Sequence, residues 1–332
     1  MLELVRPAGD VPQTMLESIE RRIRILELDL SGLTVVTEAA TGAYASTAVI
    51  AALAGARVHA CARHTRNHGS AEEAIAATRQ LARMAGIEGR IAFADTVSAS
   101  CLRRCDILTN SGRIRPITGD MVDLLPPQAV IALMFEAWEF RGSDLDLAAC
   151  RERGVRVAAV NERHADVAVF PFLGPLLVCL LRDAGVISAG KRIAVLCDNP
   201  FADFLVGGLS EAGAAASLFQ RVSDLPRATW DVVVLSLQPR DEPLGIADLK
   251  TITAKAPGAL LAQFWGDVDR PAARALGCRI CPQAEPGRGH MGILLNRLGH
   301  EPIVRLQAGS LKAAEIVRRG RMLDPGGIAS LL

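Results

Sequence analysis

The chain has 332 residues, half of them hydrophobic, and its 37 basic and 36 acidic residues give a net charge of +1. This length suits two domains of ordinary size, each with its own core. A balanced charge and an aromatic content of 4% argue against nucleic-acid and membrane-surface proteins, which need basic stripes or stacking platforms. We therefore expect a small-molecule substrate, with no nucleic-acid or membrane partner, and a homo-oligomer.

The N-terminal residues 1–13 lack the basic start and apolar core of a signal peptide. The most apolar run, residues 167–181, is too short to span a membrane. Most of the eight cysteines lie in apolar segments, as in reduced proteins, so we predict a cytoplasmic location. Cys278 and Cys281 have zinc-ligand spacing, but no second pair accompanies them, and we expect no metal site.

The opening segment has the pattern of a strand, a tight turn, a helix and a second strand. The strands are predicted at residues 34–38 and 57–62, and the helix at residues 47–54. Small residues between them match the G-x-G-x-x-G/A turn that lets a pyrophosphate reach the free N–H groups of a helix N-terminus, although the first position is alanine. The predicted dinucleotide contacts in this turn are Ala40, Thr41, Gly42, Tyr44 and Ala45.

The end of the second strand predicts which dinucleotide binds. NAD-binding proteins place a carboxylate there, on the ribose 2′-hydroxyl. This chain instead has Arg63, followed by Thr65 and Arg66. Because a planar guanidinium pairs bidentately with phosphate, we predict NADP(H), with NAD(H) as the alternative. A Rossmann-like layer without a nucleotide also fits this stretch.

Alternating strands and helices predict two α/β domains. Residues 1–166 are expected to form a Rossmann-like, doubly wound parallel sheet. Residues 167–332 are expected to form a smaller Rossmann-like domain, joined to the first by an apolar helix at 167–184. Beyond the opening unit, the predicted strands are 90–94, 106–109, 129–135, 156–160, 192–197, 231–237, 260–264 and 279–281, and the predicted helices include 13–28, 70–85, 98–104, 117–125, 201–212, 246–255 and about 310–319.

Two features of the second half bear on function. Its first strand-to-helix turn, residues 197–202, lacks glycine and has Phe201 where a small residue is needed, so we expect no dinucleotide there. The C-terminal helix is expected to pack back on the first domain.

Polar residues that follow strands are candidates for the site, because ligands of open α/β sheets bind outside the carboxyl ends of the strands. Asn110, Ser111 and Gly112 are expected to line the nicotinamide half of the dinucleotide. Arg113 and Arg115 are expected to hold an anionic substrate. A solvated loop is the structural alternative for this segment.

The next two strands also end in titratable residues. Glu136 is a candidate acid/base, and Glu139 and Glu162 are candidates for substrate contacts. His164 is a candidate for proton transfer, since its ordinary pKa lies near neutrality. Helix capping and ion pairing would be the structural explanation of the same residues.

A glycine-rich loop near residue 290 is the last candidate. Three glycines surround His290, which suggests that the backbone approaches a ligand closely. His290 is our preferred acid/base, with Arg288 as an anion clamp. A plain surface loop is the alternative.

Several stretches resemble the formate/glycerate dehydrogenase group, the D-2-hydroxyacid dehydrogenases. Residues 145–157 are similar to their D-x-x-x-C-x-x-x-G-I-x-V segment, and residues 190–195 to the G-K-x-V-x-I-V entry of their cofactor domain. The pair Cys281-Pro282 followed by His290 is similar to their strand–Pro–His element, whose histidine is the acid/base. The resemblance implies two Rossmann-like domains and a dehydrogenase activity. The chain departs from that group in two ways: its better glycine fingerprint lies in the N-terminal half, and Pro282 is not adjacent to His290.

These observations predict an NADP-dependent oxidoreductase that acts on a small polar, anionic metabolite. Two other classes remain open. A GT-B-like glycosyltransferase also uses two facing Rossmann-like domains, and a non-catalytic ligand-binding protein would keep the fold without the chemistry.

Overall fold

The computed structural model describes residues 11–64 and 69–332, and the chain divides into two compact units. The first unit holds the chain through Val169 together with Gly299–Leu332, and the second unit is Phe170–Leu298. We had expected domains of residues 1–166 and 167–332, with the C-terminal helix packing back on the first. Within the described ranges, no helix combines the length and apolar character needed to cross a membrane.

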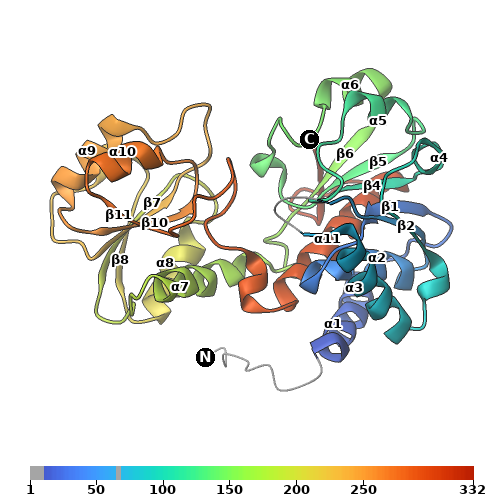
Figure 1. Ribbon diagram of the computed structural model, residues 1–332, viewed down its shortest axis with the longest axis horizontal. Helices are drawn as coiled ribbons and strands as arrows, with labels where there is room; N and C mark the ends of the chain where they lie inside the picture. Colours follow the sequence, from blue (N-terminus) through green and yellow to red (C-terminus); the bar gives the residue numbers. More distant parts are fainter. Residues whose placement is uncertain (1–10, 65–68) are drawn as a thin grey trace. The chain divides into compact units, whose positions relative to one another are not determined.

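A seven-stranded sheet forms the centre of the described part of the first unit, in the order β12-β6-β5-β4-β1-β2-β3 (Figure 1). Strands β1 to β6 run parallel in the 3-2-1-4-5-6 order of a Rossmann fold, which confirms the predicted doubly wound sheet. The antiparallel β12 pairs with β6 and was not predicted, because three residues are too few to show a pattern. The strands are β1 (Thr34–Glu38), β2 (Arg57–Cys61), β3 (Ile91–Ala94), β4 (Ile107–Asn110), β5 (Val130–Leu133), β6 (Arg156–Val160) and β12 (Ala329–Leu331).

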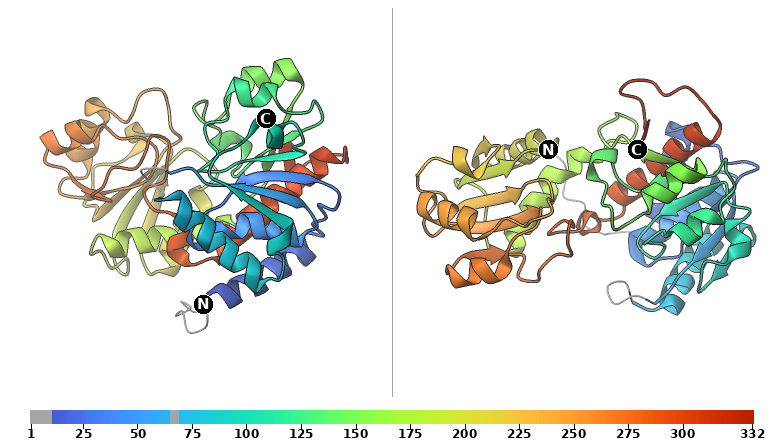
Figure 2. Two further views of the ribbon diagram at one scale, coloured as in Figure 1. Left: turned by 45° about the vertical axis from the view of Figure 1, so that its right-hand side comes forward. Right: turned by 90° about the horizontal axis from the view of Figure 1, so that it is seen from above.

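Helices cover both faces of this sheet. They are α1 (Val11–Ile25), η1 (Gly42–Ala45), α2 (Ser46–Leu53), α3 (Ala71–Met84), η2 (Glu88–Arg90), α4 (Ala99–Leu102), α5 (Gly119–Asp123), η3 (Ala137–Glu139), α6 (Leu147–Arg153) and α11 (Glu301–Arg318). The helix expected at about 310–319 is α11, which begins nine residues earlier. It packs against β5 and β6 and beside α2, as Figure 2 shows in red. Gly309 permits this approach, because a Cβ there would lie 2.9 Å from the side chain of Val167.

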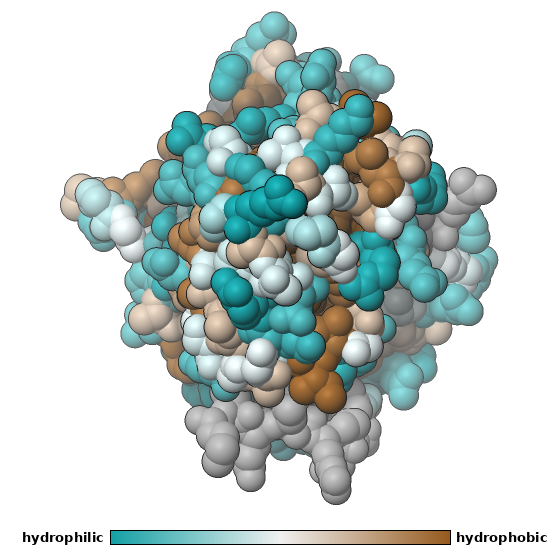
Figure 3. Space-filling model, turned by 90° about the vertical axis from the view of Figure 1, so that its left-hand side faces the viewer, coloured by the Kyte–Doolittle hydropathy of each residue, from teal (hydrophilic) through white to brown (hydrophobic). Residues whose placement is uncertain are grey.

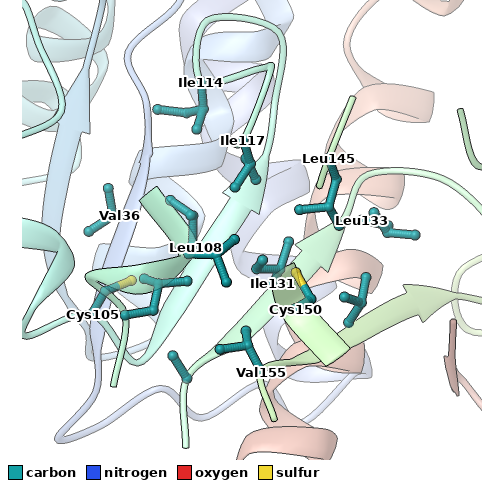
Figure 4. Close-up of a cluster of buried hydrophobic side chains, with 14 of the residues drawn as sticks. Val36, Cys105, Leu108, Ile114, Ile117, Ile131, Leu133, Leu145, Cys150 and Val155 are labelled. Carbon is teal, nitrogen blue, oxygen red and sulfur yellow. The ribbon is translucent and has the colours of Figure 1, made fainter. Parts of the chain in front are cut away.

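The other face of the first sheet carries a hydrophobic cluster (Figure 4). Alternate residues of the strands, among them Val36, Leu108 and Ile131, point to this face and meet Cys150 of α6. Burial of this apolar surface contributes about 25 cal/mol per Å². It fixes the strands whose carboxyl ends carry the candidate site.

The second unit, all of which the structure describes, has a five-stranded sheet in the order β11-β10-β9-β7-β8. Its strands are parallel and follow the 2-1-3-4-5 order of the flavodoxin-like doubly wound fold. The strands are β7 (Arg192–Cys197), β8 (Ala215–Phe219), β9 (Val232–Ser236), β10 (Leu260–Trp265) and β11 (Arg279–Cys281). Strand β8 was not predicted, because Ala215, Ala216 and Ser217 at its start give no apolar run.

The helices of the second unit are η4 (Phe170–Phe172), α7 (Leu173–Asp183), α8 (Ala202–Glu211), η5 (Val222–Asp224), α9 (Ile246–Lys255), α10 (Arg270–Ala275) and η6 (Leu295–Leu298). The helix expected at 167–184 is therefore a turn of 3₁₀ helix followed by α7. Helices α7 and α8 cross at Gly174 and Gly208, where a Cβ on Gly208 would lie 2.3 Å from the Cα of Gly174. The face of this unit seen in Figure 3 is mostly hydrophilic, with small hydrophobic areas.

Candidate functional site

The turn after β1 is held by a helix from elsewhere in the first unit. The backbone N–H of Ala40 donates to Oγ1 of Thr78 on α3 at 2.9 Å, and the Thr78 hydroxyl donates to the carbonyl of Ala40 at 3.0 Å. Gly42 has φ of +58°, the left-handed region that favours glycine, and no atom lies within 4 Å of the position its Cβ would take. The turn therefore has an open side at Gly42, the first residue of η1, which leads into α2, as a phosphate-binding turn requires.

Strand order reverses between β1 and β4, which is where doubly wound sheets bind their ligands. Asn110 ends β4 at this point and is fully buried, yet neither its Oδ1 nor its Nδ2 has a hydrogen-bond partner among the described residues. Such orphaned groups cost free energy and call for a ligand or water partner. Ser111 is paired instead, with the hydroxyl of Thr109 at 3.0 Å. Gly112 lies in the loop that follows.

A cavity of about 260 Å³ lies at the carboxyl ends of β2, β3 and β4. Its lining includes Cys61 at the end of β2, Arg63 after β2, Asp95 after β3, and Arg113 after β4. Arg63 is exposed, and its guanidinium donates to the carbonyl of Arg115. This is the part of a Rossmann sheet that receives the adenosine ribose, so a guanidinium and a carboxylate both line the expected ribose position. The other two residues predicted for it, Thr65 and Arg66, lie outside the described residues.

The arginines of the 113–115 segment contact protein groups. Arg113 is buried, and its guanidinium donates to the carbonyl of Arg63 at 2.7 Å, while its backbone N–H donates to the Glu38 carboxylate at 2.8 Å. Burial raises the pKa of Glu38. Arg115 forms an ion pair with Asp144 at 2.9 Å. Both guanidiniums thus hold loops in place, and their expected role toward an anionic substrate stays a prediction.

The structure brings Glu136, Glu139 and Glu162 together at the ends of β5 and β6. The Glu136 carboxylate accepts the backbone N–H of Glu162 at 2.8 Å, the guanidinium of Arg163 at 3.2 Å and the indole N–H of Trp138. Burial, together with the neighbouring carboxylate of Glu136, raises the pKa of Glu139 to about 8. Burial and the neighbouring carboxylates of Glu139 and Glu136 also raise the pKa of Glu162.

The acidic cluster of Glu136, Glu139 and Glu162 is suited to proton donation. Glu136 is held by charged and polar donors, whereas a pKa of about 8 favours the protonated form of Glu139 near neutral pH, and the pKa of Glu162 is also raised. A carboxylic acid in that state donates a proton to a reacting group. The sequence identified all three residues but not their shared environment, because Glu139 and Glu162 follow different strands.

The histidine candidates are separated in the fold. His164 follows β6 in the first unit, where its Nδ1 accepts the backbone N–H of Asp166 at 3.2 Å. His290 is exposed in the glycine-rich loop of the second unit. That loop is fixed by a hydrogen bond from Gly289 N–H to Asp267 at 2.8 Å and by one from Arg288 to the carbonyl of Asp241 at 2.6 Å.

The turn after β7 in the second unit is filled by its own side chains. Asn199 accepts the N–H of Phe201 at 3.1 Å and donates to the carbonyl of Ser236 at 2.6 Å. Asp198 accepts the N–H of Gln238 at 2.7 Å. Phe201 is 2% exposed, with its ring centroid 5.2 Å from those of both Phe170 and Trp265. Protein side chains thus fill this turn, and the absence of a dinucleotide there stays a prediction.

No protein-family model matches the sequence, and no curated protein matches it either. Solved structures share its fold. Dipicolinate synthase A chain from Bacillus subtilis has a TM-score of 0.57 at 11% identity, over 89% of this chain and 99% of that one. The pyruvate reductase of Chlamydomonas reinhardtii has a TM-score of 0.56 at 13% identity, over 89% and 99%.

A third structure, TP0037 from Treponema pallidum, described as a D-lactate dehydrogenase, has a TM-score of 0.51 at 11% identity, over 90% of this chain and all of that one. At these identities the likeness establishes the fold. It confirms the two-Rossmann-domain architecture that the sequence resemblance implied.

Proposed function

We propose that this protein is an NADP-dependent oxidoreductase acting on a small polar, anionic metabolite. The observation that carries the proposal is the pairing, in one sheet, of an open small-residue turn after β1 with a cavity at the ends of β2, β3 and β4. Rossmann sheets bind dinucleotides at this place. Two neighbours in fold are described as a D-lactate dehydrogenase and a pyruvate reductase, and a 3-phosphoglycerate dehydrogenase of Entamoeba histolytica, described as NAD⁺-bound, has a TM-score of 0.50.

The first unit would hold the cofactor through groups already described. Residues 40–45 would hold the pyrophosphate, and the orphaned amide of Asn110 would pair with a polar group of the cofactor. Arg63 would pair with the 2′-phosphate, which is why we propose NADP rather than NAD. When bound, the nicotinamide supplies the hydride, and the protein supplies orientation and proton transfer.

Proton transfer is assigned to the acidic cluster. Glu139 keeps part of its surface exposed, and its pKa of about 8 makes it protonated at neutral pH, so it donates a proton to a carbonyl or imine substrate. Glu136, held by Arg163 and Trp138, stays in place beside it. Arg288, with 74% of its side chain exposed, remains a candidate for the anionic group of the substrate.

The test is calorimetric titration of the whole protein with NADPH and with NADH. We expect NADPH to bind more tightly, and Arg63→Ala to weaken NADPH at least tenfold while leaving NADH unchanged, a loss of about 1.4 kcal/mol or more. The matched control is Arg240→Ala, which removes an exposed arginine of the second unit. Absence of NADPH binding at tens of micromolar, or equal losses in both variants, would overturn the proposal.

A further inference from the structure

A second polar constellation in the first unit lies outside the site described above. It consists of Cys101 on α4, His59 on β2 and Ser98, the N-cap residue of α4. The Cys101 Sγ and His59 Nδ1 atoms are 3.3 Å apart, and the Ser98 hydroxyl donates to the same sulfur at 3.1 Å. A thiol is therefore placed between a base and a hydrogen-bond donor.

The thiolate is the reactive form of cysteine, and His59 is a base at hydrogen-bond distance from the Cys101 thiol. Burial, together with the charge of Arg104, lowers the pKa of His59, so its imidazole is neutral at pH 7 and accepts the thiol proton. The Ser98 hydroxyl then stabilises the negative sulfur, because hydrogen bonds to charged acceptors are the stronger ones.

The other cysteines differ from Cys101 in their burial or in the partners of the thiol. Six of them are buried, and burial raises the pKa of the Cys61 thiol to about 12 and that of Cys150 to about 11. Cys278 is partly exposed like Cys101, but in the described part of the chain its thiol has no hydrogen-bond partner, and burial raises its pKa. Cys278 is thus an internal control for Cys101.

Cys101 is partly exposed, so a small reagent can reach its thiol from solvent. Thr96 and Val97 line the 260 Å³ cavity and directly precede Ser98. Cys61, whose pKa responds to the charge of Cys101, lines the same cavity.

We propose that Cys101 is a nucleophilic thiol that reacts with small disulfides, with His59 as its base. His59 accepts the proton of the Cys101 thiol, and the sulfur attacks one sulfur of the disulfide. A bond forms between the protein and that half of the reagent, the original S–S bond breaks, and the departing thiolate takes the proton from His59. The disulfide is the oxidant, and the inference does not depend on the proposed cofactor.

The experiment incubates the whole protein with glutathione disulfide at pH 7 and follows each cysteine by peptide mass spectrometry, with iodoacetamide labelling in parallel. We expect Cys101 to react at least tenfold faster than Cys278. His59→Gln should slow Cys101 at least fivefold and leave Cys278 unchanged, and Ser98→Ala should slow it less.

Equal rates of reaction with glutathione disulfide at Cys101 and Cys278 of the unmodified protein would overturn the proposal, and this comparison needs no variant. So would an unchanged Cys101 rate in folded His59→Gln, with folding checked by circular dichroism. If His59→Gln does not fold, His59→Asn takes its place, with Cys278 of the same protein as the reference. A slowed Cys101 rate supports the pair, and an unchanged Cys101 rate refutes it.

Discussion

In each unit the first strand of the sheet, β1 or β7, is followed by a turn and a helix, yet the two turns differ. In the first unit, Thr78 from a distant helix holds the turn, and Gly42 leaves one side of it open. In the second unit, Asn199 caps the turn from within and Phe201 fills the space beneath it. The same position in a doubly wound fold thus either faces a ligand or completes the core, and the fold alone does not decide which.

The two turns also differ in the charged groups beside them. Asp198 places a carboxylate at the second turn, balanced by Arg240 at 3.2 Å. The nearest carboxyl to the first turn along the chain, Glu38, is buried, and its raised pKa favours the neutral form.

The strongest test of this comparison is Phe201→Ala. Removing a buried phenyl ring that packs on Phe170 and Trp265 should lower the free energy of unfolding by about 3–5 kcal/mol. NADPH binding by the protein that remains folded should not change. Urea unfolding and calorimetry below the transition measure the two quantities, and Phe201→Leu, which keeps most of the volume, should lose less. Unchanged stability with lost NADPH binding would place the nucleotide at the second turn.

Glu139→Gln tests the acidic cluster of the first unit, which has no counterpart at the second turn. Burial raises the folded-state pKa of Glu139 to about 8, against 4.5 for the ordinary group. The folded protein then holds a proton that the unfolded chain releases, so the stability that Glu139 contributes is complete below pH 4.5 and is lost as the pH rises through 8.

Glutamine does not titrate, so the variant should gain stability relative to the unmodified protein as the pH rises from 5 to 9, by at least about 1.4 kcal/mol, the equivalent of one pKa unit. Urea unfolding at both pH values measures the change. Glu20→Gln, at an exposed position of α1, is the control and should show no such trend. A flat difference for Glu139→Gln would mean that the carboxyl is ionised in the folded protein.

The fold was largely predictable because buried parallel strands produce apolar runs in the sequence. Strands β5, β6 and β7 follow this rule. Strand β8 does not, since most of it is only partly buried at the edge of its sheet. Helix α11 was placed too late, because it is buried on nearly all sides from Pro302 onward and so lacks a one-sided pattern at its start.

The candidate site was predictable only where its residues lie close to one another in the sequence. The small residues of the first turn and Arg63 lie within one strand–turn–helix–strand unit. Thr78, which holds that turn, is 38 residues away from Ala40. The pair His59–Cys101 spans 42 residues. Such contacts depend on the order of the strands and on the packing of helices, which no local pattern contains.

The smallest expected effect belongs to Gly42→Ala, and it isolates the open side of the first turn. A methyl group at φ +58° is strained by about 1 kcal/mol, but it meets no atom within 4 Å, so the protein should fold. Gly86→Ala is a matched control, because Gly86 has φ of +69°, has no atom within 4 Å of its Cβ position and lies beyond α3.

Thermal or urea unfolding should show the same loss of about 1 kcal/mol in the Gly42→Ala and Gly86→Ala proteins, because both substitutions place alanine in the same left-handed conformation. Calorimetry should separate them: Gly42→Ala should weaken NADPH binding severalfold, since its methyl group occupies the side of the turn that a pyrophosphate approaches, and Gly86→Ala should not. If the two variants bind NADPH equally well, the first turn is a packing element like the second, and the nucleotide does not bind there.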